Sequence, residues 1–274
     1  MRLSPRHPRY ASLRVRARLA EAHRKGLVVS EGLIAQGRAE AFDYLFGERT
    51  SPSARRAERV AAEWLLAARY PVVSVNGNVA ALAASEVAAL ARAIPGLGVE
   101  VNLFHRTRLR AEAVARTLRR AGVSRVLGVR PTATIPRLPS DRARVDRDGI
   151  FRADLCLVPL EDGDRAEALR ALGKRVISID LNPLSRTSRA ADLPIVDEVQ
   201  RALREIALAA RARRGRGPVP SLRPFDRRAA LADALETIAS ALSRPAAPRP
   251  IAPPRRRASR RRSRGTGGRS RQTP

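Results

Sequence analysis

The chain has 274 residues, of which 44% are apolar, and a formal net charge of +28. This length suits one or two domains, and the apolar content can fill a sizeable core. No run of about 18 apolar residues occurs, which excludes a membrane-spanning helix, and the amino terminus lacks the apolar segment of a secretory signal. The single cysteine, Cys156, excludes an intramolecular disulfide and is expected to be a buried strand residue. We therefore expect a folded cytoplasmic protein.

Part of the positive charge lies at the C-terminal end. Residues 245–274 contain ten arginines and no acidic residue, which leaves a charge of +18 for the rest. Their Pro, Ser, Gly and Arg composition cannot bury a core and predicts a disordered tail. Such a tail would bind polyanions weakly and with strong salt dependence. A general bias toward arginine is the alternative explanation, because Lys25 and Lys174 are the only lysines.

Hydrophobic periodicity predicts three helices first, at about residues 8–25, 30–46 and 53–68. Strands and helices then alternate. The predicted strands lie near residues 72–75, 99–103, 125–129, 154–158, 175–179 and 194–196, and the helices between them lie near 79–94, 107–121 and 163–173. This order indicates an α/β fold with a Rossmann-like, mostly parallel sheet covered by helices on both faces.

The predicted elements suggest four parts of the chain. An N-terminal helical segment at residues 1–70 is expected to pack on a Rossmann-like, ligand-binding core at residues 71–212, which ends in a helix near 197–212. A linker and an amphipathic helix follow at residues 213–244, because Phe225, Leu231, Leu235, Ile238 and Leu242 form one apolar stripe. The basic tail at residues 245–274 completes the chain.

Two strand-to-helix turns carry polar residues that are suited to ligands. Asn76 and Asn78 flank Gly77 after an apolar strand, and Asp180 and Asn182 follow a second such strand. The carboxyl ends of parallel strands line the ligand crevice, and the free N–H groups of a following helix suit an anion. The alternative is that Asn-Gly and Asn-Pro are ordinary turn residues.

The absence of several common motifs argues against the classes of enzyme that they mark. The chain has neither a Gly-x-Gly-x-x-Gly turn nor a Gly-x4-Gly-Lys-Ser/Thr loop, and no Gly-x-Ser-x-Gly elbow. Its three histidines, at positions 7, 23 and 105, lack metal-ligand spacing. What remains are polar clusters at residues 38–44, 102–107, 159–165 and 180–189. These clusters mix arginines, amides and carboxylates, as the binding of phosphates, Mg²⁺ and a polar substrate requires.

At these clusters the chain resembles the archaeal phosphopantothenate synthetases, a family also called 4-phosphopantoate–β-alanine ligase. The resemblance extends from about residue 5 to about residue 204 and is carried by residues 7–10, 37–45, 73–82, 158–165 and 179–186. It implies a homodimeric ligase that uses ATP and Mg²⁺ to join (R)-4-phosphopantoate to β-alanine. The products would be 4′-phosphopantothenate, AMP and diphosphate, formed through an acyl-adenylate in coenzyme A biosynthesis.

The resemblance also implies which residues contact ATP. The aligned positions are Arg16, Arg38, Asp180, Leu181, Asn182, Arg186, Thr187, Glu198 and Val199. A solvated surface role is the alternative for each arginine, and helix or turn capping is the alternative for Asp180 and Asn182. Four residues depart from the family pattern: Gln36 replaces a histidine, Ala39 a glycine, His105 a tyrosine and Glu198 an asparagine. The carboxylate of Glu198 puts its proposed ATP contact in doubt.

The substrate site is inferred from the predicted strand ends. The residues expected to face the crevice are Asn76, Asn78, Asn102, His105, Arg106, Asp162, Asp164 and Arg165. We expect Arg106 or Arg165 to hold the substrate phosphate, and Asp162 or Asp164 to coordinate Mg²⁺ or the β-alanine ammonium group. The alternative for the two acidic residues is capping of the helix that begins near Gly163.

Two other functions fit the sequence. The first is a nucleotide-sensing protein that associates with nucleic acid through its basic tail, although 3% aromatic residues leave no evident platform for stacking bases. The second is a ligase that accepts unphosphorylated pantoate, although the His-x-Gly-His signature of bacterial pantothenate synthetases is absent.

Overall fold

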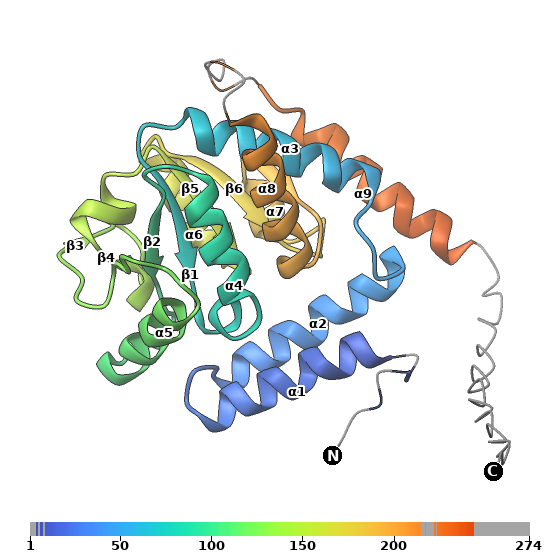
Figure 1. The fold of residues 1–274 in the computed structure, drawn as a ribbon. Helices are drawn as coiled ribbons and strands as arrows, with labels where there is room; N and C mark the ends of the chain where they lie inside the picture. The colour runs from blue at the N-terminus through green and yellow to red at the C-terminus, as the bar shows by residue number, and fades with distance from the viewer. Residues whose placement is uncertain are drawn as a thin grey trace, which may run out of the picture.

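Three helices precede the sheet in the computed structural model, which describes residues 4, 6–7, 9–214, 217, 222 and 224–243 (Figure 1). They are α1 (Tyr10–Arg24), α2 (Ser30–Phe46) and α3 (Pro52–Ala67), as predicted. The Ser51 hydroxyl accepts a hydrogen bond from the Ala54 N–H, and Pro52 occupies the first turn of α3. The predicted disordered tail lies outside the described residues.

The central sheet has five strands, and every pair of neighbours is parallel. Its strands, in spatial order, are β2 (Gly98–Val101), β1 (Pro71–Val75), β5 (Leu155–Pro159), β6 (Arg175–Ile179) and β7 (Leu193–Ile195). The chain first moves outward from β1 to β2 and then returns past β1 to β5. This reversal makes the gap between the carboxyl ends of β1 and β5 a topological switch point, the usual place for a ligand in such sheets.

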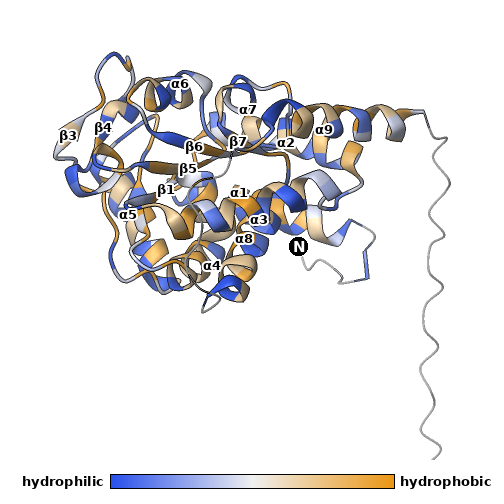
Figure 2. Ribbon diagram, turned by 90° about the horizontal axis from the view of Figure 1, so that it is seen from above, coloured by the Kyte–Doolittle hydropathy of each residue, from blue (hydrophilic) through white to orange (hydrophobic). Residues whose placement is uncertain are grey.

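Helices cover both faces of the sheet (Figure 2). One face packs against α3, α4 (Gly77–Ala93), α5 (Arg108–Arg120) and α8 (Val199–Arg213), and the other against α6 (Gly163–Ala171) and α7 (Arg186–Ala190). Side chains alternate between the two cores along each strand, so that Leu155 and Leu157 face one and Cys156 and Val158 the other. The parallel α/β fold and the burial of Cys156 are thereby confirmed.

The predicted strand near residues 125–129 is wrong. Only Leu127 forms a parallel bridge, with Glu100 of β2, and the chain then leaves the sheet at Gly128, whose φ of 77° favours glycine. An insertion follows that the sequence did not predict. It holds a two-stranded ribbon of β3 (Ala133–Thr134) and β4 (Arg144–Val145), a 3₁₀ turn (Asp141–Ala143) and a π turn (Arg147–Phe151).

Glu100 fastens this insertion to β2. Its side chain is fully buried, and its two carboxylate oxygens accept hydrogen bonds from the N–H groups of Asp146 (2.9 Å) and Ile150 (2.6 Å). Burial raises the pKa of Glu100 to about 7. The backbone of the insertion is therefore held at the edge of the sheet by a side chain of the sheet itself.

The last helix, α9 (Arg227–Leu242), leans on α3 and α2. Leu231 and Ile238 of the predicted apolar stripe pack against the apolar cluster around Phe46, whereas Leu235 and Leu242 are exposed. Within the part of the chain that the structure describes, no helix is both long and apolar enough to cross a membrane.

A second buried acid, Glu58 on α3, lies beside Asp197 in the layer between α3 and α8. Burial, and then the charge of Asp197, raise the pKa of Glu58 above the ordinary glutamate value. Asp197 itself accepts hydrogen bonds from the Thr50 hydroxyl and the Arg201 guanidinium group. The neutral form of Glu58 therefore suits the folded state.

We expect Glu58→Gln to be more stable than the wild type at pH 8, by about 1 to 3 kcal/mol. A raised pKa means that the contribution of Glu58 to stability is present below the ordinary glutamate pKa and is lost as the pH rises. Urea unfolding at pH 4.5 and pH 8 checks this, with Glu63→Gln on the same helix as the control. A difference between Glu58→Gln and the wild type that does not change with pH would contradict the assignment.

Candidate active site

A cleft of about 780 Å³ opens at the carboxyl ends of β1, β5 and β6, and helix α2 forms one of its walls. It includes the switch point between β1 and β5. Nine of the predicted site residues line it: Arg38, Asn76, Asn78, His105, Asp162, Asp180, Asn182, Arg186 and Thr187. The structure therefore brings residues from both predicted turns into one site.

The turn after β1 is shaped by its asparagines. The Asn76 amide oxygen caps α4 by accepting a hydrogen bond from the Val79 N–H, and its amide nitrogen donates to the Leu160 carbonyl (2.9 Å). Asn78 donates to the Gly32 carbonyl of α2 (2.7 Å). Asn76 therefore has a capping role in the turn, whereas Asn78 links the start of α4 to α2. The N–H groups of Gly77 and Asn78 meet no acceptor among the described residues.

The turn after β6 uses its polar side chains in the same way. Asp180 accepts a hydrogen bond from the Asn182 N–H and Asn182 accepts one from the Leu184 N–H, both at 2.9 Å. Burial raises the pKa of Asp180, and the Asn182 N–H, the Ser185 hydroxyl and the charge of Arg38 only partly oppose this shift. Thr187 donates to the Glu161 carbonyl (2.6 Å), and Arg186 is exposed in an ion pair with Glu167.

Below the cleft lies a buried ion-pair cluster that sequence reasoning missed. The Glu161 carboxylate contacts Nη1 of Arg142 (2.9 Å) and Nη1 of Arg165, and Arg142 also pairs with Asp162 (2.9 Å). The side chains of Glu161, Arg142 and Arg165 are 1%, 8% and 0% exposed. Arg142 nevertheless reaches the cleft, and it enters from the unpredicted insertion.

Arg110 is the other cationic residue of the cleft that the sequence did not single out. It lies in the first turn of α5, two residues after Arg108, and donates to the carbonyl oxygens of His105 and Leu27. Burial and the nearby charge of Arg142 lower the pKa of Arg110. His105 approaches Glu31 of α2 at 3.8 Å across the mouth of the cleft.

Three predicted substrate residues have structural contacts instead of lining the cleft. Arg165 is fully buried against Glu161 and the Ser74 hydroxyl. Arg106 donates to the carbonyl oxygens of Gly128 and Val129, and Asn102 donates to those of Arg142 and Arg144. Arg106 and Asn102 therefore hold the insertion in place. A fourth predicted residue, Asp164, lies in the first turn of α6 away from the lining residues.

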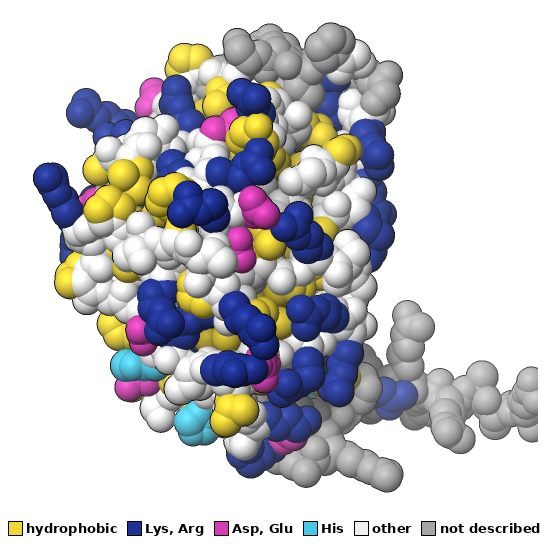
Figure 3. Space-filling model, turned by 90° about the vertical axis from the view of Figure 1, so that its left-hand side faces the viewer, with side chains coloured by type: hydrophobic (Ala, Val, Ile, Leu, Met, Phe, Trp, Pro, Cys, Tyr) yellow, Lys and Arg dark blue, Asp and Glu magenta, His cyan; other side chains and the backbone are white. Residues whose placement is uncertain are grey.

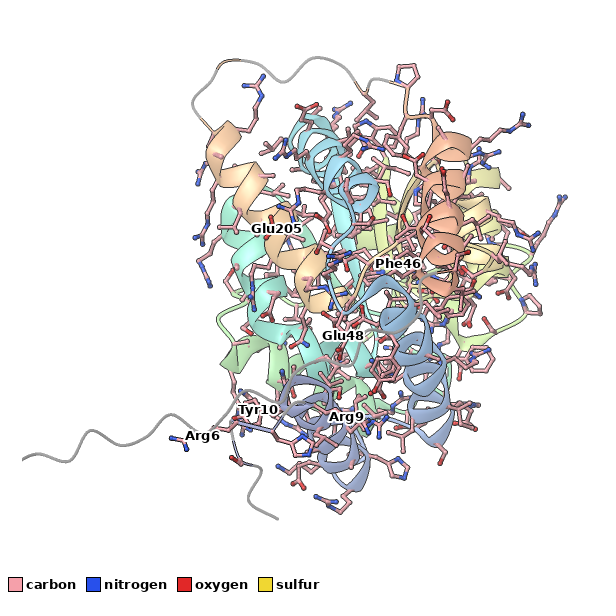
Figure 4. All side chains as sticks on the ribbon, turned by 90° about the vertical axis from the view of Figure 1, so that its right-hand side faces the viewer. Arg6, Arg9, Tyr10, Phe46, Glu48 and Glu205 are labelled. Carbon is pink, nitrogen blue, oxygen red and sulfur yellow. The ribbon has the colours of Figure 1, made fainter. Side chains whose placement is uncertain are left out.

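Four predicted ATP contacts also lie outside the cleft lining. Arg16 pairs with Glu40 (2.9 Å) between α1 and α2, where Arg9 joins the same network through Tyr44. Figure 4 shows Arg9 at the start of α1. The side chains of Leu181 and Val199 are buried in apolar clusters.

The fourth, Glu198, caps α8 by accepting hydrogen bonds from the N–H groups of Gln200 and Arg201. Glu198 therefore has a structural role at the start of α8, because its carboxylate oxygen accepts hydrogen bonds from otherwise unpaired N–H groups. Among all the described residues, no group of three or more His, Cys, Asp or Glu side chains is arranged to hold a metal ion.

We expect Glu161→Gln to lose about 3 to 5 kcal/mol of unfolding free energy, because it removes the ion-pair partner of the fully buried Arg165 and leaves Arg142 with Asp162 alone. Glu167→Gln is the matched control, since it breaks only the exposed pair with Arg186 and should cost less than about 1 kcal/mol. Urea unfolding at pH 7 measures both. Equal losses in the two variants would show that the buried cluster does not stabilise the site.

Comparison with known proteins gives a consistent result. The family model for phosphopantothenate/pantothenate synthetase matches residues 53–241. A 4-phosphopantoate–β-alanine ligase of Methanospirillum hungatei is 56% identical over 201 residues, which cover 73% of this chain and 82% of that protein. The enzyme of the same name from Methanosarcina mazei is 48% identical over 235 residues, covering 85% and 92%. The chain therefore belongs to the phosphopantothenate/pantothenate synthetase family.

Proposed function

We propose that this protein is a 4-phosphopantoate–β-alanine ligase of coenzyme A biosynthesis. The observation that carries the proposal is one continuous cleft at the switch point, which joins the turn after β6 to the turns after β1 and β5. A ligase that activates a carboxylate with ATP needs this arrangement, because nucleotide and acid must meet before the amine attacks. The resemblance of the sequence and the family membership agree with this function.

The half of the cleft around β6 suits ATP. Arg38 on α2 and Arg186 at the start of α7 supply positive charge, and Asp180, Asn182 and Thr187 supply polar contacts to the same space. Arginine neutralises phosphate oxygens well. The carboxylate of Asp180 and the hydroxyl of Thr187 are oxygen ligands of the kind Mg²⁺ prefers, and Mg²⁺ would offset the charge that develops on the phosphates.

Arg16, Leu181, Glu198 and Val199 remain proposed ATP contacts on the resemblance alone. Leu181 and Val199 would contribute through their backbones, since both side chains are buried.

The half of the cleft around β1 and β5 suits the two smaller substrates. Asp162 is the half-exposed carboxylate of this half, with a side chain 48% exposed, so it is the better of the two acidic candidates for the β-alanine ammonium group. His105, Asn76 and Asn78 line the same half. The amine would then attack the activated carboxylate of an acyl-adenylate, which releases AMP. We also propose that the protein is a homodimer, as the resemblance implies.

The nucleic-acid alternative has less support from the described residues. Figure 3 shows basic side chains scattered over one face of the molecule and separated by apolar and uncharged surface. A duplex-binding site needs a continuous basic stripe that follows the phosphate backbone. The arginine bias of the whole composition accounts for such scattered charges.

We expect the purified chain to release AMP and diphosphate from ATP and Mg²⁺ only when both 4-phosphopantoate and β-alanine are present. Omitting each component in turn, and replacing 4-phosphopantoate with pantoate, tests the substrate choice. A chain truncated after Ser243 should keep this activity, because the cleft residues all lie before it. Absence of AMP under every combination would reject the ligase function.

We further expect Arg38→Ala to raise the KM for ATP by about 10- to 100-fold, which is the value of one charge-assisted contact to phosphate. The KM for 4-phosphopantoate should change by less than about threefold. Arg119→Ala, on the exposed side of α5, is the control. An unchanged KM for ATP in Arg38→Ala would remove Arg38 from the nucleotide site.

A further inference from the structure

Two arginines that neither sequence motif nor resemblance pointed to meet in the half of the cleft around β1. Arg110 comes from α5, and Arg142 comes from the insertion between β2 and β5. They lie close enough for the charge of Arg142 to lower the pKa of Arg110. Arg142 is paired with the carboxylates of Glu161 and Asp162, whereas Arg110 has no ion pair among the described residues. A bound anion would offset the charge of Arg110.

Carbonyl oxygens hold the guanidinium group of Arg110, and carboxylates hold that of Arg142, but one nitrogen of each group has no protein partner. Nε and Nη1 of Arg110 donate hydrogen bonds to the carbonyl oxygens of Leu27 and His105, respectively. Nε of Arg142 pairs with Asp162, and its Nη1 pairs with Glu161. Nη2 of neither arginine takes part in any hydrogen bond or ion pair among the described residues. Both side chains line the cleft, so these nitrogens are available to a ligand there.

The start of α4 adds a third source of donors beside Arg110. A Cβ on Gly77 would lie 3.0 Å from Nη2 of Arg110 and would collide with the Leu27 carbonyl oxygen, so only glycine fits there. The N–H groups of Gly77 and Asn78 have no acceptor within the described part of the chain. A helix of 17 residues starts at this point, and its free N–H groups favour an anion.

We propose that Arg110, Arg142 and the N-terminus of α4 form the subsite for the phosphate group of 4-phosphopantoate. This inference rests on the proposed ligase function and deepens it. A phosphate monoester carries nearly two negative charges and three acceptor oxygens, which match two free guanidinium nitrogens and two free N–H groups. Pantoate has a neutral hydroxyl at that position and cannot offset the charge of Arg110. The subsite therefore selects the phosphorylated acid.

The neighbouring arginines do not compete for this role. Arg106 donates hydrogen bonds to the carbonyl oxygens of Gly128 and Val129, and Arg165 is fully buried in its ion pair with Glu161. Arg165 acts instead as a positioning residue, since it fixes the carboxylate that holds Arg142. Arg38 and Arg186 line the cleft with Asp180 and Asn182 from the turn after β6, where the triphosphate is proposed to bind.

The test is binding of 4-phosphopantoate to the full-length chain by calorimetry, without ATP, alongside steady-state kinetics. We expect Arg110→Gln to weaken binding and to lower kcat/KM for 4-phosphopantoate by about 10- to 100-fold. The KM for ATP, and kcat/KM for any turnover of pantoate, should change less than about threefold. Arg142→Lys, which keeps the buried charge, should show the same pattern if its thermal unfolding matches the wild type.

Arg108→Gln is the matched control, because Arg108 lies on the same helix with its side chain 70% exposed. A selective rise in the KM for ATP would assign the arginines to the nucleotide phosphates and overturn the proposal. Unchanged binding of 4-phosphopantoate in a folded Arg110→Gln would also overturn it. Tight binding that Arg110→Gln abolishes, without AMP release by the wild type, would support the subsite and reject the ligase function instead.

Discussion

The cleft depends on the buried carboxylate of Glu161, because four segments of the chain meet around this residue: the insertion, β1, α6 and α7. Its carboxylate holds Arg142 of the insertion and Arg165 of α6. Arg165 in turn bonds Ser74 of β1, and the Glu161 carbonyl accepts the hydroxyl of Thr187 at the start of α7. Asp162 also pairs with Arg142, so the cluster holds two carboxylates and two guanidinium groups and its formal charges balance. Its contribution to the cleft is therefore to fix the positions of these side chains.

Side chains at and just after the end of β2 hold the insertion in position. Glu100 binds two of its N–H groups, and Asn102 binds two of its carbonyl oxygens, including that of Arg142 itself. Arg106 adds a third tie by holding residues 128 and 129. Asn102 and Arg106, which the sequence suggested as substrate ligands, thus bind the backbone of the insertion. They fix the backbone that carries Arg142, and that backbone sets where its guanidinium group enters the cleft.

Much of the fold could be predicted from periodicity, since buried parallel strands give uninterrupted apolar runs and the helices between them give amphipathic ones. The insertion could not, because strands of two residues carry no period and their place is set by contacts with β2. The site was predicted where polar residues directly follow strands, as at Asn76 and Asp180. Arg110 and Arg142 gave no such signal, being arginines among many. The inward turn of Arg165 did have a signal, because Glu161 precedes it by four residues, the spacing of a helical ion pair.

The α1–α2 hairpin takes part in the site although it lies outside the sheet, because α2 forms one wall of the cleft. Helix α2 walls the cleft, yet it is fastened to the core mainly through polar contacts, such as the pairing of Asp43 with Arg201 of α8. Its apolar support comes from a small cluster in which Ala39 and Phe46 pack with Leu181, Val196 and Ala234. Ala234 lies on α9, which leans on α2 from outside (Figure 1). Helix α9 contributes no residue to the cleft lining, but it packs against the wall that carries Arg38. The family match, at residues 53–241, includes nearly all of this helix.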